Sequence, residues 1–65
     1  METIIEKLPK EKSDLDKKIT KLNDFITKNE KYQSLSEMQQ LLLVMQSKAM
    51  ETYSDVLQAR IIEME

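Results

Sequence analysis

The sequence contains no cysteine, histidine, tryptophan or glycine, and only one proline among 65 residues. Without cysteine it forms no disulfide, and without cysteine and histidine it lacks the usual ligands of a zinc site. The same absences remove imidazole acid–base catalysis and thiol nucleophiles. We therefore predict a protein that is not an enzyme, with no catalytic residue, no metal site and no cofactor.

The charges are nearly balanced, with ten Lys+Arg against twelve Asp+Glu and a net charge of −2. Such mixed patterns are typical of solvated helix surfaces and give no strong attraction to nucleic acid or to an anionic membrane. The one basic cluster, Lys17, Lys18 and Lys21, has Asp14 and Asp16 beside it. The longest apolar run, residues 41–45, is too short to span a bilayer. We expect a cytoplasmic protein without nucleic-acid or membrane partners.

Apolar spacing and the near absence of helix breakers predict an all-α fold in one domain, residues 1–65. Pro9 suits the first turn of a helix and pushes Leu8 towards extended geometry, which places a break between a segment 1–9 and the first helix. A first helix over about residues 10–29 then follows from a stripe at steps of four, three and four, formed by Leu15, Ile19, Leu22 and Ile26.

The turn is expected over about residues 30–36, where no apolar period is present. Ser36 with Gln39, or Ser34 with Glu37, can form a capping box that begins the second helix. That helix should run over about 37–64 and pack antiparallel to the first as a hairpin.

The second helix has more apolar surface than one partner helix can cover. One stripe consists of Met38, Leu42, Met45, Ala49, Thr52 or Tyr53, and Val56, and a second lies roughly 100° round the helix. A hairpin covers one stripe and leaves the other exposed. We therefore predict self-association into a helical bundle, most simply a four-helix dimer, with an oligomer interface on the second stripe, formed by Leu43, Met50, Leu57 and Ile61.

A polar column at a spacing of seven residues runs beside the apolar surface of the second helix. Arginine binds phosphate through two hydrogen bonds, tyrosine offers a stacking face, and glutamine can read a base or ribose edge. The alternative is that these side chains only fix the register between helices. The candidate ligand-binding residues are Gln39, Gln46, Tyr53 and Arg60.

Within residues 14–62 the chain carries two motifs, L-D-x-K-I-x-K-L-x-x-F-I in the first helix and L-L-x-x-Q-x-x-A-M-x-x-Y-x-x-x-L-x-x-R-I in the second. With these motifs it resembles a group of short phage proteins related to a crAss-like phage protein. The resemblance implies a phage origin but no settled activity, and the Pro9 region departs from the family pattern, which continues as helix there. In size and hairpin architecture the chain is also similar to phage sponge proteins that sequester cyclic-nucleotide immune signals. The matching residues are Leu15, Asp16, Lys18, Ile19, Lys21, Leu22, Phe25, Ile26, Leu42, Leu43, Gln46, Ala49, Met50, Tyr53, Leu57, Arg60 and Ile61.

Three functions remain open on this sequence. The first is a phage counter-defence protein, an oligomer that sequesters a cyclic or other nucleotide signal in the host cytoplasm without turning it over. The second is an interaction module that docks a host or phage protein through the second apolar stripe. The third is a purely structural, self-assembling coiled coil.

Overall fold

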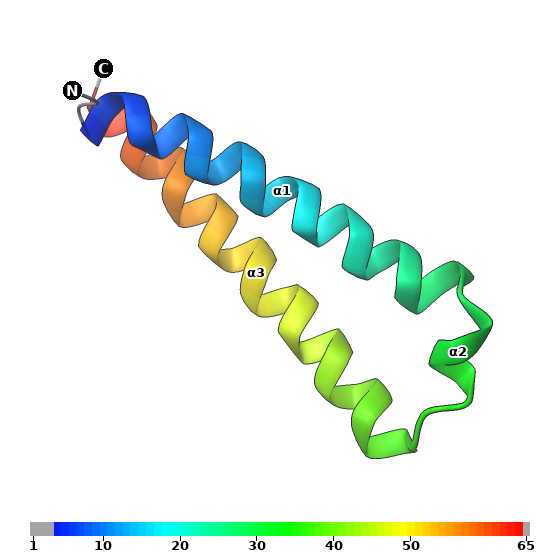
Figure 1. Ribbon diagram of the computed structural model, residues 1–65. Helices are drawn as coiled ribbons and strands as arrows, with labels where there is room; N and C mark the ends of the chain where they lie inside the picture. Colours follow the sequence, from blue (N-terminus) through cyan, green and yellow to red (C-terminus); the bar gives the residue numbers. More distant parts are fainter. Residues whose placement is uncertain (1–3, 65) are drawn as a thin grey trace.

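The computed structural model describes residues 4–64, with side chains described from Lys7 to Met64. Helix α1 spans Ile4–Lys28, the short helix α2 spans Glu30–Gln33, and α3 spans Glu37–Glu63. Helices α1 and α3 pack antiparallel, so the start of α1 lies beside the end of α3, and α2 lies at the opposite end of the hairpin (Figure 1). The described chain is all-helical and elongated, with principal extents of 45 × 17 × 16 Å.

Helix α1 begins earlier than Pro9 predicts. The expected break before Pro9 is absent, and the proline lies inside a continuous helix that starts at Ile4. An interior proline costs a backbone hydrogen bond and a steric clash. Leu8 is nevertheless 3% exposed, and continuing the helix through Pro9 keeps Leu8 in the packed interface. We infer that this burial offsets the cost of the proline.

The chain reversal contains one helical turn and two side-chain caps. Asn29 caps α2 by accepting a hydrogen bond from the Lys31 N–H at 2.9 Å. Of the two predicted capping residues for the second helix, Ser36 is the one that caps α3, and its hydroxyl accepts from the Gln39 N–H at 3.2 Å. Helix α3 therefore begins at Glu37.

A single glutamine, Gln40, holds the reversal against α3. Its side-chain amide donates to the carbonyls of Tyr32 at 3.1 Å and Leu35 at 3.2 Å, and to that of Gln33 at 3.3 Å. The Tyr32 hydroxyl donates in return to the Gln40 carbonyl at 3.2 Å. Tyr32 also packs edge-to-face on Phe25 of α1, with ring centroids 6.1 Å apart. These contacts join the end of α1, the reversal and the start of α3.

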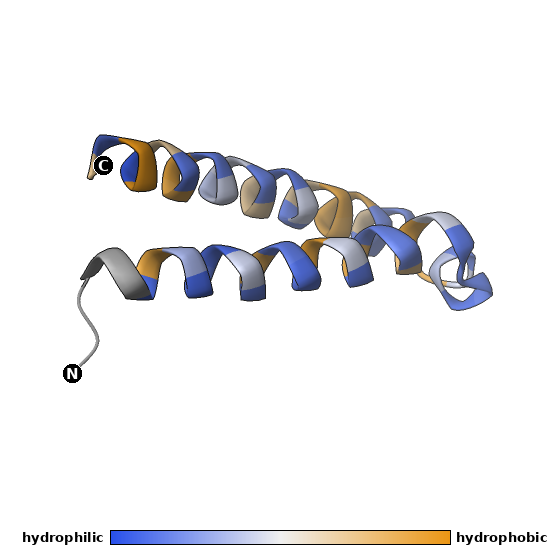
Figure 2. Ribbon diagram, turned by 90° about the horizontal axis from the view of Figure 1, so that it is seen from above, coloured by the Kyte–Doolittle hydropathy of each residue, from blue (hydrophilic) through white to orange (hydrophobic). Residues whose placement is uncertain are grey.

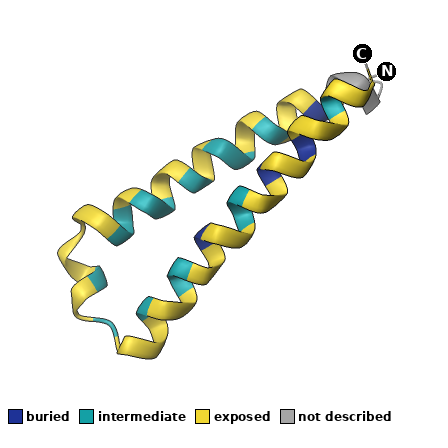
Figure 3. Ribbon diagram, turned by 180° about the vertical axis from the view of Figure 1, so that it is seen from behind, coloured by how far each residue is buried: buried dark blue, intermediate teal, exposed yellow. Residues whose placement is uncertain are grey.

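The face of α3 that packs on α1 is not the one the sequence analysis predicts. Leu57 is fully buried in the hairpin, and Leu43, Met50 and Ile61 lie beside it at intermediate exposure. These four residues, predicted from the sequence as an oligomer interface, therefore face α1 within the single chain. Figure 3 shows how few positions are buried, most of them in the half of the hairpin that holds the termini.

The opposite face of α3 is apolar and open to solvent. Hydrophobic segments recur along both helices, and more densely along α3 (Figure 2). The chain exposes 5268 Å², whereas a compact protein of this mass exposes about 4,300 Å². No described helix is both long and apolar enough to cross a membrane. The exposed large apolar side chains of α3 are Met38, Leu41, Leu42, Met45, Tyr53, Val56, Ile62 and, at its C-cap, Met64.

Candidate functional site

Polar pairs occupy the interior between the two long helices. The buried Ser54 hydroxyl donates to the Asp16 carboxylate at 2.6 Å, and the buried Ser47 hydroxyl donates to the Asn23 side-chain carbonyl at 2.5 Å. The two serines lie seven residues apart on α3, and their partners, Asp16 and Asn23, lie seven residues apart on α1. Because only one antiparallel register aligns both pairs, they specify how the helices align.

Asp16 also joins this interior to the surface. The Lys12 ammonium donates to its carboxylate at 2.7 Å. The hydrogen bond from Lys12, followed by that from Ser54, holds the pKa of Asp16 below its ordinary value, while partial desolvation acts in the opposite direction. The carboxylate is therefore charged at neutral pH and holds one side chain from each helix.

The polar column predicted from the sequence lies along one edge of α3, where all four of its residues are exposed. Tyr53 leans across to α1 and donates its hydroxyl hydrogen bond to the Glu11 carboxylate. That bond raises the pKa of Tyr53, desolvation and the Glu11 charge add to the effect, and the Arg60 charge opposes it. Gln39 and Gln46 have no side-chain partner among the described residues. The column is thus a solvent-accessible row. Among the side chains that the structure describes, Tyr53 is the one member that hydrogen-bonds across to α1, as a register-fixing role would require.

Arg60 lines a shallow hollow at the end of this row. The hollow measures about 360 Å³, and its walls come from Val56, Ala59, Glu63 and Met64 as well as Arg60. No carboxylate among the described side chains lies within ion-pair distance of the guanidinium. An exposed guanidinium beside apolar surface can bind phosphate through two parallel hydrogen bonds, and the Tyr53 ring one heptad away offers a stacking face.

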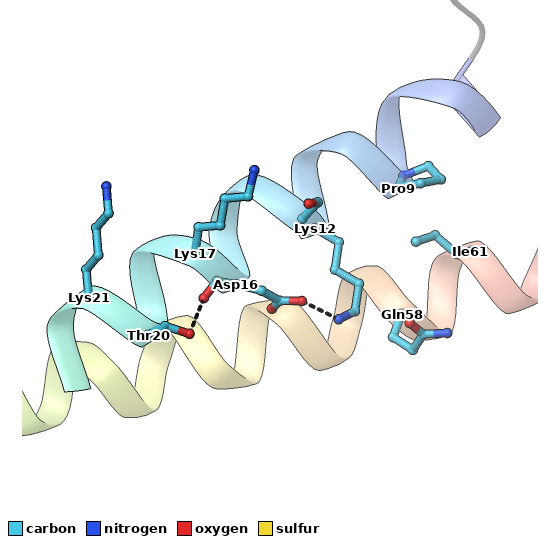
Figure 4. Close-up of a pocket in the computed structure, with 9 residues that line it drawn as sticks. Pro9, Lys12, Asp16, Lys17, Thr20, Lys21, Gln58 and Ile61 are labelled. Atoms are coloured by element: carbon cyan, nitrogen blue, oxygen red, sulfur yellow. Dashed lines mark hydrogen bonds and ion pairs between the residues drawn. The ribbon is translucent and has the colours of Figure 1, made fainter. Parts of the chain in front are cut away.

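A larger open groove of about 730 Å³, which no sequence pattern predicts, lies on another edge of the hairpin. Figure 4 shows Ile61 close to Pro9 at one end of the groove, Lys12 reaching towards Asp16, and Lys17 and Lys21 extending away. The Lys12 charge is engaged by Asp16, and the other two lysines are exposed. The groove combines residues distant in sequence (Lys12 and Asp16 with Gln58 and Ile61), so only the helix register could have revealed it.

A family model described as Sequestin matches residues 2–63, nearly the whole chain. No curated protein and no solved structure matches.

Proposed function

Because the chain belongs to the Sequestin family, we propose that it binds and withholds a small ligand and does not convert it. The family name describes sequestration, and the absence of cysteine and histidine from the sequence suits binding without turnover. We further propose that the ligand is a nucleotide-type signalling molecule and that the protein serves a phage against a host defence. This part rests on the resemblance to phage proteins and on the chemistry of the polar column.

The observation that carries the proposal is the exposed row formed by Gln46, Tyr53 and Arg60. At 1.5 Å per residue, one heptad separates successive members by about 10.5 Å along the helix. A nucleotide can lie along such a row, with its base on the Tyr53 ring, its phosphate on the Arg60 guanidinium and an edge read by Gln46. Glu11 beside the Tyr53 hydroxyl favours the phosphate at the Arg60 end.

The alternative function, docking of a partner protein, was assigned to the second apolar stripe of α3. The second apolar stripe packs inside the hairpin, and its central residue Leu57 is 0% exposed. A partner could reach Leu57 only by separating α1 from α3. We therefore do not retain docking through that stripe.

Native mass spectrometry of the full chain mixed with cyclic and linear nucleotides tests the proposal. We expect a complex whose added mass equals that of an unmodified nucleotide and which persists without product formation. Arg60→Ala should weaken binding at least tenfold, and Arg60→Lys should recover only part of it because the second hydrogen bond is lost. Lys18→Ala is the matched control, since Lys18 is an exposed cation on α1, away from the row, and it should bind as the parent does.

Variants at Tyr53 separate stacking from hydrogen bonding. Tyr53→Phe keeps the ring and should keep most of the affinity, whereas Tyr53→Ala should lose it. Glu11→Gln removes a negative charge beside the row and should strengthen binding of an anionic ligand several-fold. If no nucleotide adds to the folded chain, or if Arg60→Ala binds as well as the parent, the proposal is wrong.

A further inference from the structure

The exposed apolar face of α3 has the periodicity of a second coiled-coil seam. Its positions alternate in steps of four and three and carry no charge until Glu63 takes the next position. The seam lies on the side of α3 away from α1, and every described member is exposed. A seam of this length needs a partner with the same spacing. We call it the outer seam; its members are Met38, Leu42, Met45, Ala49, Thr52, Val56 and Ala59.

We propose that the outer seam binds a second copy of this chain, with the two α3 helices antiparallel about a twofold axis near Met50 and Glu51. The chain as a whole exposes 5268 Å², on the order of 1,000 Å² more than a compact protein of its mass. A standard interface covers about 800 Å² per partner, which is comparable with this difference.

The flanking residues on one side of the outer seam are self-complementary in this arrangement. They are Leu41, Lys48, Asp55 and Ile62, again at a spacing of seven. In an antiparallel pair, Lys48 of one copy faces Asp55 of the second, twice by symmetry, and Leu41 faces Ile62. Leu41 is 52% exposed and Ile62 is 56% exposed in the single chain. The antiparallel register therefore covers two apolar side chains per copy and pairs both charges.

The parallel register leaves more of this flank unmatched. Leu41 would then face Gln46, and Lys48 would face Tyr53, while Asp55 would face Arg60. Ile62 would lose its apolar partner. The antiparallel arrangement is also favoured by the opposed helix dipoles.

The other flank of the outer seam is the polar column itself. Pairing the seams places Gln46 of one copy opposite Tyr53 of the second, and Gln39 opposite Arg60. Each ligand position would then combine Tyr53 and Arg60 of one copy with Gln46 and Gln39 of the other. The proposed dimer does not depend on the proposed function. The assignment of two equivalent nucleotide sites per dimer, where the polar columns of the two copies meet, does rest on the proposed function.

Charge reversal tests the register. Asp55→Lys puts two like-charged pairs across the interface and should weaken dimerisation roughly tenfold, measured by sedimentation equilibrium at low salt. Within one chain it adds a favourable Glu51–Lys pair at i, i+4, so the helical content should not fall. Lys48→Asp alone should also weaken the dimer, and the double reversal should restore it. In a parallel dimer the double reversal would restore nothing, and that result would overturn the register.

Blocking the seam tests the dimer and the shared site separately. Ala49 lies near the axis and is exposed in the hairpin, so Ala49→Glu should give a folded monomer, whereas Ser13→Glu on exposed α1 surface should remain a dimer. A parent chain that stays monomeric at millimolar concentration contradicts the dimer. An Ala49→Glu monomer that binds nucleotide as tightly as the parent contradicts the shared site and leaves sequestration intact. A dimer that binds no nucleotide contradicts the proposed function and leaves the seam intact.

Because the chain has no cysteine, introduced cysteines report the arrangement directly. A mixture of Leu41→Cys and Ile62→Cys chains with a short bis-maleimide should give the mixed cross-link in preference to either self-cross-link. Self-cross-links at both positions without the mixed product would show parallel pairing and overturn the proposal.

Discussion

The two faces of α3 differ in the opposite direction from the usual arrangement of apolar residues inside and polar residues outside. The face against α1 carries Gln40, Ser47 and Ser54 between its apolar residues, and each of the three makes a hydrogen bond. The outer seam carries no charged side chain before Glu63 and is exposed. We infer that the hydrogen-bond acceptors on α1 decide which face of α3 packs against it. Asp16 and Asn23 provide acceptors at matching intervals, so the face with serines is the one that fits.

The largest expected difference between the faces comes from matched leucine truncations. Leu57→Ala removes a fully buried side chain and should lower the free energy of unfolding by about 2–4 kcal/mol. Leu42 is 46% exposed, so Leu42→Ala should cost under about 0.5 kcal/mol in dilute monomer. Urea denaturation at micromolar concentration measures both. Equal losses would mean that the burial of the two faces has been assigned incorrectly.

The buried serines should show a smaller effect. Ser47→Ala and Ser54→Ala each remove a cross-helix hydrogen bond and should cost about 0.5–1.5 kcal/mol. Thr52→Ala on the outer seam is the control, since the Thr52 hydroxyl bonds only to the carbonyl of Lys48 on its own helix. It should change the free energy of unfolding by less than about 0.5 kcal/mol. A more stable Ser54→Ala chain would argue against a stabilising role for that pair.

A pH titration tests the Asp16 carboxylate, which accepts the hydrogen bond from Ser54. The pKa of Asp16 is lower in the folded chain than its ordinary value of 3.8, so its contribution to stability is complete above the unfolded pKa. That contribution is lost as the pH falls through the folded pKa. NMR titration should give a pKa for Asp16 below 3.8. Lys12→Gln and Ser54→Ala should each raise it, with Lys12→Gln having the larger effect.

The smallest effect on stability is expected for the Tyr53–Glu11 pair, which lies at the edge between the two faces of α3. The hydrogen bond to Glu11 raises the pKa of Tyr53, so Glu11→Gln should lower that pKa towards its ordinary value near 10. Tyrosinate absorbance measures the change, and Tyr53→Phe identifies which of the two tyrosines is responsible. Stability should change little, because the pair is exposed. An unchanged pKa in Glu11→Gln would mean that the contact does not persist in solution.

Much of the hairpin follows from the sequence because its signals are local. The stripe around Ile19, the turn without apolar period and the Ser36 cap all depend on residues within one or two helical turns. The start of α1 at Ile4 depends instead on burial of Leu8 by a distant helix, which outweighs the local preference at Pro9. Sequence patterns within one or two helical turns contain no information about that contact between distant residues.

The candidate site was predictable as a set of residues but not as a surface. The spacing of Gln39, Gln46, Tyr53 and Arg60 identifies one edge of α3, and the structure places all four in solvent. Which apolar stripe lies inward could not be read from hydrophobicity, since the outer seam is the more apolar. The sequence feature that could have identified the inward face is a spacing of seven residues shared by the two helices. It separates Asp16 from Asn23 on α1 and Ser47 from Ser54 on α3.

The Gln40 contacts also bear on how quickly the chain can find its fold. All the carbonyls that receive its amide lie five to eight residues away, and loops of that size close in roughly 10–100 ns. The reversal can therefore close before the ends of α1 and α3 meet, and helix pairing can then proceed outward from the turn, each new contact only slightly farther along the chain than the last. Folding by such short steps is typically fast, in the microsecond to millisecond range. Gln40→Ala should slow folding more than it speeds unfolding, placing the rate-determining event at the end of the hairpin opposite its best-buried residues.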